Sequence, residues 1–486
     1  MALGNISFVQ EPVNGTSKVP VITNWTPLIG YMVYQDDISS LFYFKLILEV
    51  RLDDASGTLI AKMKQRRNGY SSDITNNRAR AFFDLRDIVN SQLVDTVFDQ
   101  NDTGVPFRTI HKVGVNTGAK PFSVNGDSRI GKTQIQTIYV KAYQQYSEAA
   151  DEIPTEDTTP TVNDTLYYLQ ASLPLMTARS TDSDYVQSDA FNVYNASGTT
   201  DLFLSDVETS TGDYNLSGYL NYIQDTDYHT VAFLNDSSKF DSDIDFIEVA
   251  YYDSAGSLIN SKQYIANISA NGGEAPTYGS LTDAERLLYF GCGAGNLEAQ
   301  SDTSAARPSN NSGWVYYTIR GTGNNSGTIA YKTATYYFIK QDASCKGYKV
   351  RRLAWRNSVG GYDYFNFKKK STQSINVQRN NYSSMLGTFN GSKWRYNNTQ
   401  RGKTTRQTTA TLNEMLNTDW ITEQDANLLE KLIMSTDVYI VENADTDFTQ
   451  AVMIKDSSFV KKTVANDKLI KYTINIEYAN PVNTNS

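Results

Sequence analysis

The chain has 486 residues, of which 40% are apolar and only 20% are charged, so its composition excludes intrinsic disorder and allows several cores. Its 33 tyrosines, together with abundant Thr, Asn and Ser, favour strands joined by long turns. The net charge of −9 lacks the basic excess of a duplex-DNA binder, so nucleic acid is disfavoured as the main partner. We therefore predict a mainly β protein with two or three β-sandwich-like domains.

The first domain is expected over residues 1–150, as a β-sandwich with one inserted helix. Between Leu41 and Leu52, apolar residues of one parity alternate with mostly polar ones, which is typical of a strand with one buried face. A helix is predicted at about Asp84–Val97, where apolar residues follow helical spacing. Strand chemistry returns at Ile135–Tyr143.

A second β-sandwich is predicted over residues 165–272. It is preceded by 151–164, an acidic segment with Pro and Thr that predicts a linker or an exposed hairpin tip. Asp253–Gly256 is a hairpin signal within the second sandwich. The expected strands include Tyr228–Leu234, Phe246–Tyr252 and Leu258–Ile265.

The third domain, residues 273–486, is predicted to be α+β with one amphipathic helix. A short helix is expected at Thr282–Leu288, and the main helix at Glu423–Met434. Thr422 occupies the N-cap position of the main helix, with Asp425 three residues further on. Its buried stripe is expected to contain Leu428, Leu429, Leu432 and Ile433.

Two glycine-rich segments match cofactor loops in letters but lack their context. Gly126–Thr133 fits the phosphate-loop pattern, yet the β-branched run Gln134–Val140 follows where a helix is required. Gly291–Gly295 resembles the glycine loop of methyltransferases, but Tyr289 stands where an acid is usual. That loop should lead into a helix, whereas Ser301–Gly313 is rich in Ser, Asn and Pro, so no helix is expected. Both segments are interpreted as turns of β domains, and no cofactor is predicted.

Alternating carboxylates form two candidate cation clusters. They are Asp225, Asp227 and His229, and Asp241, Asp243 and Asp245. A calcium loop of EF-hand type needs Gly at its sixth position, where this chain has Phe246. Solvated turn carboxylates are favoured, and no metal ligand is predicted, although bound calcium stays an open alternative.

The cysteines and histidines indicate no catalytic centre. Cys292 and Cys345 are favoured as two free buried thiols, with one bridge left open. No local signature joins either cysteine to His111 or His229 as a nucleophile pair. We therefore predict no catalytic residue and expect that the protein is not an enzyme.

The chain start and the apolar runs indicate a protein made in a cytoplasm. The N-terminal residues lack the basic and apolar regions of a signal peptide. No apolar run approaches the roughly 20 residues of a membrane helix, so no membrane span is expected.

A basic stretch with interleaved aromatic residues carries the candidate interaction surface. Such a stretch could line a path for single-stranded nucleic acid. Because the whole chain is acidic, a contact with an acidic neighbouring subunit is favoured. The candidate surface consists of Trp355, Arg356, Tyr362, Tyr364, Lys368, Lys369 and Lys370.

The run Arg352–Phe367 resembles a strand in tail, baseplate and neck proteins of tailed bacteriophages, with the pattern W-x-N-x-x-G-x-x-D-x-F-x-F. The order of elements from Trp420 to Asn480 adds to this resemblance, which covers about residues 345–480. It implies a structural component of the virion, assembled in the bacterial cytoplasm. The expected partners are copies of itself, in a symmetric oligomer, and other virion proteins.

Two alternatives to a structural role stay open. One is a receptor- or glycan-binding module of a tail spike or fibre, with aromatic residues as platforms. The other is a tail-associated polysaccharide or cell-wall hydrolase, since carboxylates are abundant.

Overall fold

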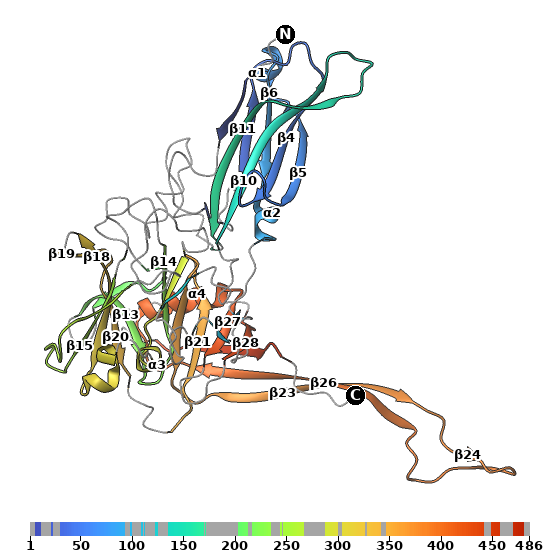
Figure 1. The fold of residues 1–486 in the computed structure, drawn as a ribbon. Helices are drawn as coiled ribbons and strands as arrows, with labels where there is room; N and C mark the ends of the chain where they lie inside the picture. Colours follow the sequence, from blue (N-terminus) through green and yellow to red (C-terminus); the bar gives the residue numbers. More distant parts are fainter. Residues whose placement is uncertain are drawn as a thin grey trace. The chain divides into compact units, whose positions relative to one another are not determined.

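The protein is mainly β, as predicted, and its elements fall into two compact units (Figure 1). The structure is a computed structural model that describes residues 5–10, 21–22, 30–92, 98–99, 108–109, 111, 122–124, 135–169, 171, 203–211, 216–234, 244, 246–266, 287–299, 304–325, 328–341, 347–441, 449–456 and 470–480. Unit 1 comprises Met1–Lys340 and Asn357–Asp363; unit 2 comprises Gln341–Arg356 and Tyr364–Ser486. None of the helices in these described ranges has the length and apolarity to cross a lipid bilayer.

Unit 1 begins with the expected sandwich, in which a sheet of order β1-β3-β6 packs on one of order β2-β11-β10-β4-β5. The strands are β1 Ile6–Gln10, β2 Val21–Ile22, β3 Gly30–Gln35, β4 Phe42–Leu52, β5 Leu59–Arg66, β6 Ala79–Asp84, β10 Ile135–Ser147 and β11 Thr155–Leu169. Both sheets contribute to one core, with Val33 and Phe83 from the first and Leu46, Val140 and Tyr168 from the second. The alternation along β4 holds in part: Phe44, Leu46, Leu48 and Val50 are buried, whereas Phe42 is exposed and Ile47 of the other parity is buried.

The helices of this sandwich are shorter than predicted. The helix expected at Asp84–Val97 is observed as α2, Arg86–Asn90, and residues 93–97 lie outside the described part of the chain. A second short helix, α1, spans Ser71–Thr75.

For the acidic segment 151–164, the predicted hairpin tip is observed at residues 151–154, and the alternative of a linker is wrong. Residues 148–154 form the tip of a long hairpin, and β11 pairs with β10 from Thr155 to Leu169, so the sandwich extends beyond residue 150. The β-branched Thr and Val residues of this segment suit a strand. Glu156 is neutralised there by ion pairs with Lys62 and Lys64 of β5, at 2.5 and 2.7 Å.

The middle of unit 1 is a second layered β-structure that extends past the predicted boundary at residue 272. Its large sheet has the order β12-β13-β20-β18-β15-β16, with β19 paired to β18, and its small sheet is β14-β17-β9. The elements are β7 Phe98–Asp99, β8 Arg108–Thr109, β9 Phe122–Val124, β12 Thr209–Thr211, β13 Ser217–Ile223, β14 Thr230–Leu234, β15 Phe246–Tyr252, β16 Gln263–Ala266, β17 Leu287–Gly291, α3 Ala294–Ala299, β18 Tyr316–Asn325, β19 Thr328–Tyr331 and β20 Tyr336–Lys340.

Strands from both sides of that predicted boundary share one core. Phe233 and Ile247 pack in the same cluster as Phe290, Tyr317 and Phe338. The strand predicted at Phe246–Tyr252 is observed with those bounds. Of the short helix predicted at Thr282–Leu288, Leu287 and Leu288 lie in β17, and the other residues fall outside the described ranges.

Unit 2 is an α+β fold built on a sheet of order β22-β21-β27-β28-β29-β26-β23. Its strands are β21 Arg351–Arg356, β22 Tyr362–Phe367, β23 Thr372–Ser383, β26 Lys403–Asn417, β27 Val438–Val441, β28 Thr449–Ile454 and β29 Thr473–Tyr478; a small hairpin pairs β24 Thr388–Phe389 with β25 Trp394–Arg395.

The predicted main helix of unit 2 is confirmed as α4, Glu423–Met434. The Thr422 hydroxyl accepts a hydrogen bond from the Asp425 backbone N–H at 3.2 Å, and the Asp425 carboxylate accepts from the Thr422 backbone N–H at 3.1 Å. This reciprocal capping box fixes the start of the helix. Leu428, Leu429 and Leu432 are buried.

A charge placed in the helix core should unfold unit 2. Leu429 is fully buried, so Leu429→Asp would require burial of an unpaired carboxylate. We expect loss of the helical circular dichroism signal and rapid proteolysis within unit 2. The control is Gln424→Asp on the exposed face of the same helix. A Leu429→Asp protein as resistant to protease as this control would contradict the assigned packing.

Candidate interaction surface

Most of the predicted interaction surface lies inside the protein. Trp355, Tyr362, Tyr364 and Arg356 are buried, the last with only 8% of its surface exposed. They are therefore not available to a neighbouring subunit in this structure. Of the seven candidates, Lys368 is half-buried, and Lys369 and Lys370 are exposed.

The basic side chains of β21 have partners within unit 2. The Arg356 guanidinium donates to the Asp437 carboxylate at 2.9 Å. That of Arg352 donates to the Asn366 side-chain oxygen at 2.8 Å and lies over the Tyr364 ring. Arg352 and Arg356 each have a partner 14 or more residues away in the sequence. The run of basic residues in β21 therefore does not form a solvated face.

The glycine-containing part of the phage-like motif forms a tight turn in unit 1. The Asn357 side-chain oxygen accepts hydrogen bonds from the Val359 and Gly361 backbone N–H groups, and its NH₂ group donates to the Leu204 carbonyl at 2.8 Å. A Cβ atom on Gly361 would lie 2.0 Å from the Leu204 carbonyl oxygen. Gly360 has a φ of +92°, which favours glycine. These motif residues hold backbone in place.

The motif aspartate, Asp363, is buried beside a second, half-buried carboxylate, Asp206. The Asp363 carboxylate accepts from the Ser205 hydroxyl at 2.6 Å and from the Asp206 backbone N–H at 2.8 Å. Asp206 in turn accepts from the Ser358 backbone N–H at 2.7 Å. Burial and the nearby negative charge of Asp206 raise the pKa of Asp363 to about 7. With 1% of its surface exposed, Asp363 cannot contact a polymeric substrate in this structure.

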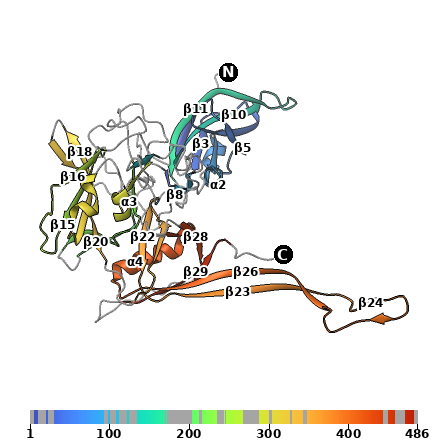
Figure 2. The same cartoon turned by 60° about the horizontal axis from the view of Figure 1, so that its bottom comes forward.

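A long two-stranded ribbon, which we call the arm, projects from the sheet of unit 2 (Figures 1 and 2). It comprises residues 372–417, in which β23 and β26 pair from Thr372↔Met415 to Ser383↔Lys403. The last pair between β26 and its other neighbour, β29, is Asn413↔Glu477. From Ile375 outward, the strands therefore have only each other as partners in the described residues, over about 30 Å.

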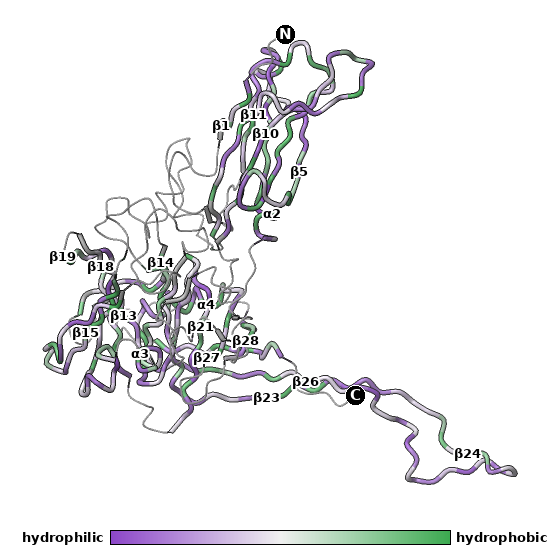
Figure 3. The backbone as a smooth tube through the Cα atoms, in the orientation of Figure 1, coloured by the Kyte–Doolittle hydropathy of each residue, from purple (hydrophilic) through white to green (hydrophobic). Residues whose placement is uncertain are grey.

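The two faces of the arm differ in polarity. The opposed residues Ile375↔Leu412 and Val377↔Ala410 share one face. On the opposite face, the neighbouring β23 positions are Ser374, Asn376 and Gln378. Every residue of β23 is exposed, including Ile375 at 58% and Val377 at 41%. Hydrophobic residues consequently recur among hydrophilic ones along the arm (Figure 3).

The arm tip presents aromatic and basic side chains on an ordered loop. The Trp394 indole N–H donates to the Leu386 carbonyl at 2.7 Å. Gly387 has a φ of +101°, and a Cβ atom there would lie 2.4 Å from the Trp394 indole nitrogen. Phe389, Trp394 and Tyr396 are nevertheless 65%, 47% and 69% exposed. Exposed aromatic residues beside cations are typical of interface anchors.

The arm lies in the most basic stretch of an acidic chain. No Asp or Glu occurs between Asp363 and Glu414. The basic residues in that interval are Lys368, Lys369, Lys370, Arg379, Lys393, Arg395, Arg401, Lys403 and Arg406. Because the whole chain carries −9 and these nine residues carry +9, the remaining residues carry −18.

A buried network holds the base of the arm. The Glu414 carboxylate accepts from Arg351 at 2.9 Å, from the Tyr478 hydroxyl at 2.5 Å and from the Gln373 amide at 3.1 Å. Burial alone would raise the pKa of Glu414, but these hydrogen bonds, with one from Ser371, bring the pKa below its ordinary value.

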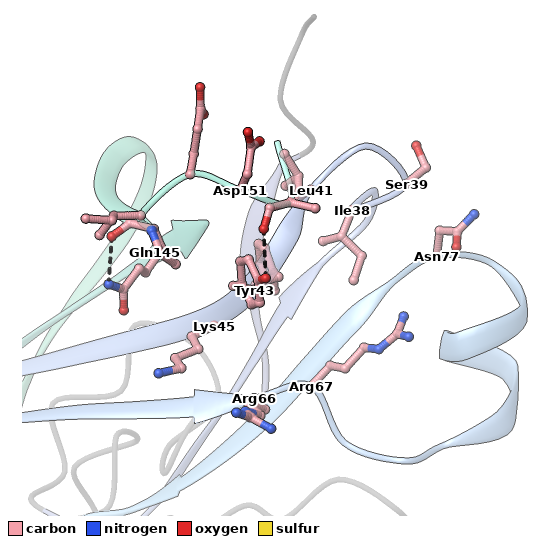
Figure 4. Close-up of a pocket in the computed structure, with 15 residues that line it drawn as sticks. Ile38, Ser39, Leu41, Tyr43, Lys45, Arg66, Arg67, Asn77, Gln145 and Asp151 are labelled. Carbon is pink, nitrogen blue, oxygen red and sulfur yellow. Dashed lines mark hydrogen bonds between the residues drawn. The ribbon is translucent and has the colours of Figure 1, made fainter. Parts of the chain in front are cut away.

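A pocket of about 900 Å³ lies beside the β10–β11 hairpin tip in unit 1 (Figure 4). Its lining includes apolar Ile38, Leu41 and Phe44, basic Lys45, Arg66 and Arg67, and acidic Asp151 and Glu152. The Tyr43 hydroxyl donates to the Ala150 carbonyl at 2.8 Å, which ties the tip to β4. The pocket thus has an acidic and a basic wall.

The discounted glycine loops have different outcomes. Gly126–Thr133 lies outside the described residues, but the strand β10 follows it, as predicted. The expectation that no helix follows Gly291–Gly295 is wrong, because α3 begins at Ala294. Cβ atoms on Gly293 and Gly295 would lie about 2.4–2.5 Å from backbone atoms of residues 226–229. Close backbone packing explains the glycines of Gly291–Gly295, all of which are buried.

The carboxylate and cysteine predictions are resolved only in part. Asp225 forms an ion pair with Lys340 at 2.7 Å, and buried Asp227 accepts from the Gln224 backbone N–H. Asp241, Asp243 and Asp245 fall outside the described ranges, and within those ranges no cluster of metal-ligating side chains occurs. Cys292 is a buried free thiol, and Cys345 lies outside the described residues.

Comparison with known proteins finds no match to a protein-family model and no curated relative.

Removal of the carboxylate at the arm base should destabilise unit 2. Glu414→Ala removes the buried carboxylate that accepts from Arg351, Tyr478 and Gln373, a change that costs about 3–5 kcal/mol. We expect a lower denaturation midpoint in urea. Glu414→Gln keeps the volume and should cost less. Equal midpoints for Glu414→Ala and the wild type would contradict the role of the network.

The raised pKa of Asp363 should make unit 1 less stable as pH rises. Between its ordinary pKa of 3.8 and about 7, the folded protein binds more protons at Asp363 than the unfolded chain does. The resulting stabilisation, at most about 4 kcal/mol, is complete below pH ~4 and lost by pH ~7. Asp363→Asn should flatten this dependence in urea titrations across pH 4–8. Parallel pH profiles of stability for the variant and the wild type would contradict the raised pKa of Asp363.

Proposed function

We propose that the protein is a structural subunit of a tailed-bacteriophage particle, in the tail, baseplate or neck–collar region, and that the arm joins it to a neighbouring subunit. The phage-like run Arg352–Phe367 supports a place in a phage particle, and the exposed arm supports a contact with a neighbouring subunit. The proposed role is non-catalytic, and its place is the virion, assembled in the bacterial cytoplasm.

The exposure of the arm is the observation that carries this proposal. A two-stranded ribbon is only marginally stable in water because neither face is covered. The apolar face with Ile375 and Val377 adds an unfavourable exposed patch. Both costs fall when a neighbour covers that face, so assembly stabilises a feature that has little support in an isolated chain.

The strand edges of the arm offer a second mode of contact. β23 is the edge strand of its sheet, and outward of Leu412 β26 also lacks a second strand partner among the described residues. Free strand edges pair readily with strands of other chains. Pro is absent from residues 372–417, whereas a register shift at Asn380/Asn381 and the basic side chains limit uncontrolled pairing.

Deletion of the arm should abolish assembly without unfolding the protein. Residues 375–412 are replaced by Asn-Gly, a two-residue turn that connects the register partners Ser374 and Asn413. Glu414 and its partners remain. We expect wild-type-like circular dichroism, but a monomer in analytical ultracentrifugation where the full chain forms a defined oligomer. A full chain that stays monomeric at high concentration, or a deletion variant that assembles normally, would refute the proposal.

A matched pair of variants separates the two faces of the arm. Ile375→Lys with Val377→Lys places two cations on the apolar face, and Asn376→Lys with Gln378→Lys places the same charge on the polar face. Only the first pair should weaken the oligomer. This control excludes added charge as the cause.

Binding of a host glycan is a second candidate, favoured by the exposed Phe389, Trp394 and Tyr396 of the arm tip. Aromatic rings of this kind also serve as ligand platforms. Whole-cell or glycan-array binding that Trp394→Ala abolishes, in a protein that does not oligomerise, would support this function instead.

A further inference from the structure

The stretch that contains most of the arm and one distant segment of the chain carry opposite charge in unusual excess. Residues 364–413 contain nine basic residues and no acidic one. Residues 142–261 contain 21 acidic residues and only two basic ones, Arg179 and Lys239, which gives −19. Segregation on this scale gives long-range attraction between copies and makes contact between two arms unfavourable.

The hairpin tip of β10–β11 is the described part of the acidic segment that is best exposed. Glu148, Asp151 and Glu152 are exposed there, with no Lys or Arg between them in the sequence. Ile153 beside them is 87% exposed. Glu156, by contrast, is already paired with Lys62 and Lys64. The tip therefore offers three carboxylates and an apolar side chain for an external partner.

The pocket beside this hairpin tip suits the aromatic side chains of the arm tip. Its second wall carries Lys45, Arg66 and Arg67, which would repel the arm cations. The flat guanidinium groups of arginine stack well on aromatic rings. An arm tip that directs Lys393 and Arg395 to the carboxylates and its aromatic rings to the arginines would satisfy both walls.

We propose that the arm tip of one copy, with Lys393, Trp394 and Arg395, docks on the acidic β10–β11 tip and its pocket in a second copy. This inference rests on the proposed function and specifies its contact. The two surfaces are different patches, so the contact can be repeated head-to-tail, which generates a ring or a filament. Since its charges are exposed, the association should weaken as salt rises.

Charge reversal on each side provides the test. The arm-reversed variant is Lys393→Glu with Arg395→Glu, and the tip-reversed variant is Glu148→Lys with Asp151→Lys and Glu152→Lys. Each variant alone should associate at least about tenfold more weakly than the wild type in sedimentation at low salt. All of these positions are exposed, so circular dichroism should remain wild-type-like.

An equimolar mixture of the two variants should recover assembly. The unchanged arm of the tip-reversed protein meets the unchanged tip of the arm-reversed protein, and the two reversed surfaces are again complementary. A control mixture of the arm-reversed variant with wild type lacks the second contact and should recover less.

Three outcomes would overturn the inference. In the first, the tip-reversed variant assembles like the wild type although arm deletion abolishes assembly; the proposed function then stands and only this contact fails. In the second, the mixture does not recover. In the third, the arm binds a poly-dT oligonucleotide while tip reversal leaves assembly unchanged, which would assign the basic arm to nucleic acid. Failure of arm deletion itself to affect assembly would instead refute the proposed function.

Discussion

The position of the arm depends on β26, which takes part both in the sheet of unit 2 and in the arm. The last residues of β26, Asn413–Asn417, pair with β29 inside the sheet, whereas its earlier residues pair only with β23. The sheet and the Glu414 network therefore fix where the arm begins, although the arm contributes no core of its own. An extended ribbon can then present both faces and both edges to neighbours without loss of the fold that holds it.

Charge segregation complements this geometry. Soluble proteins usually intersperse charges of both signs on their surfaces. Here the basic excess is concentrated at 364–413 and the acidic excess at 142–261, so identical segments repel and unlike segments attract. Repulsion between arms disfavours a two-fold contact between like patches. Head-to-tail association remains favourable, and it is the kind of contact from which rings and filaments are built.

Local patterns predicted local structure, and long-range pairing explains the errors. The alternation at Phe44–Val50 of β4, apart from buried Ile47, and the Thr422–Asp425 capping box each lie within one element and were confirmed. The buried positions of Trp355 and Arg356 depend on β27 and Asp437, about 80 residues away, so a basic aromatic run suggested a surface. Most of the arm was not predicted, because beyond Val377 and Ala410 solvent on both faces removes the apolar alternation by which strands are recognised.

The phage-like motif and the arm contribute differently to the argument for function. Asn357 and Gly361 shape a turn against Leu204, and Asp363 closes it through Ser205 and Asp206. A motif with these contacts specifies a fold, and a fold is compatible with many roles. The arm makes few such contacts within the chain, because most of its side chains face solvent. The proposed contact with a neighbour therefore depends on the faces, edges and charge of the arm and not on the motif.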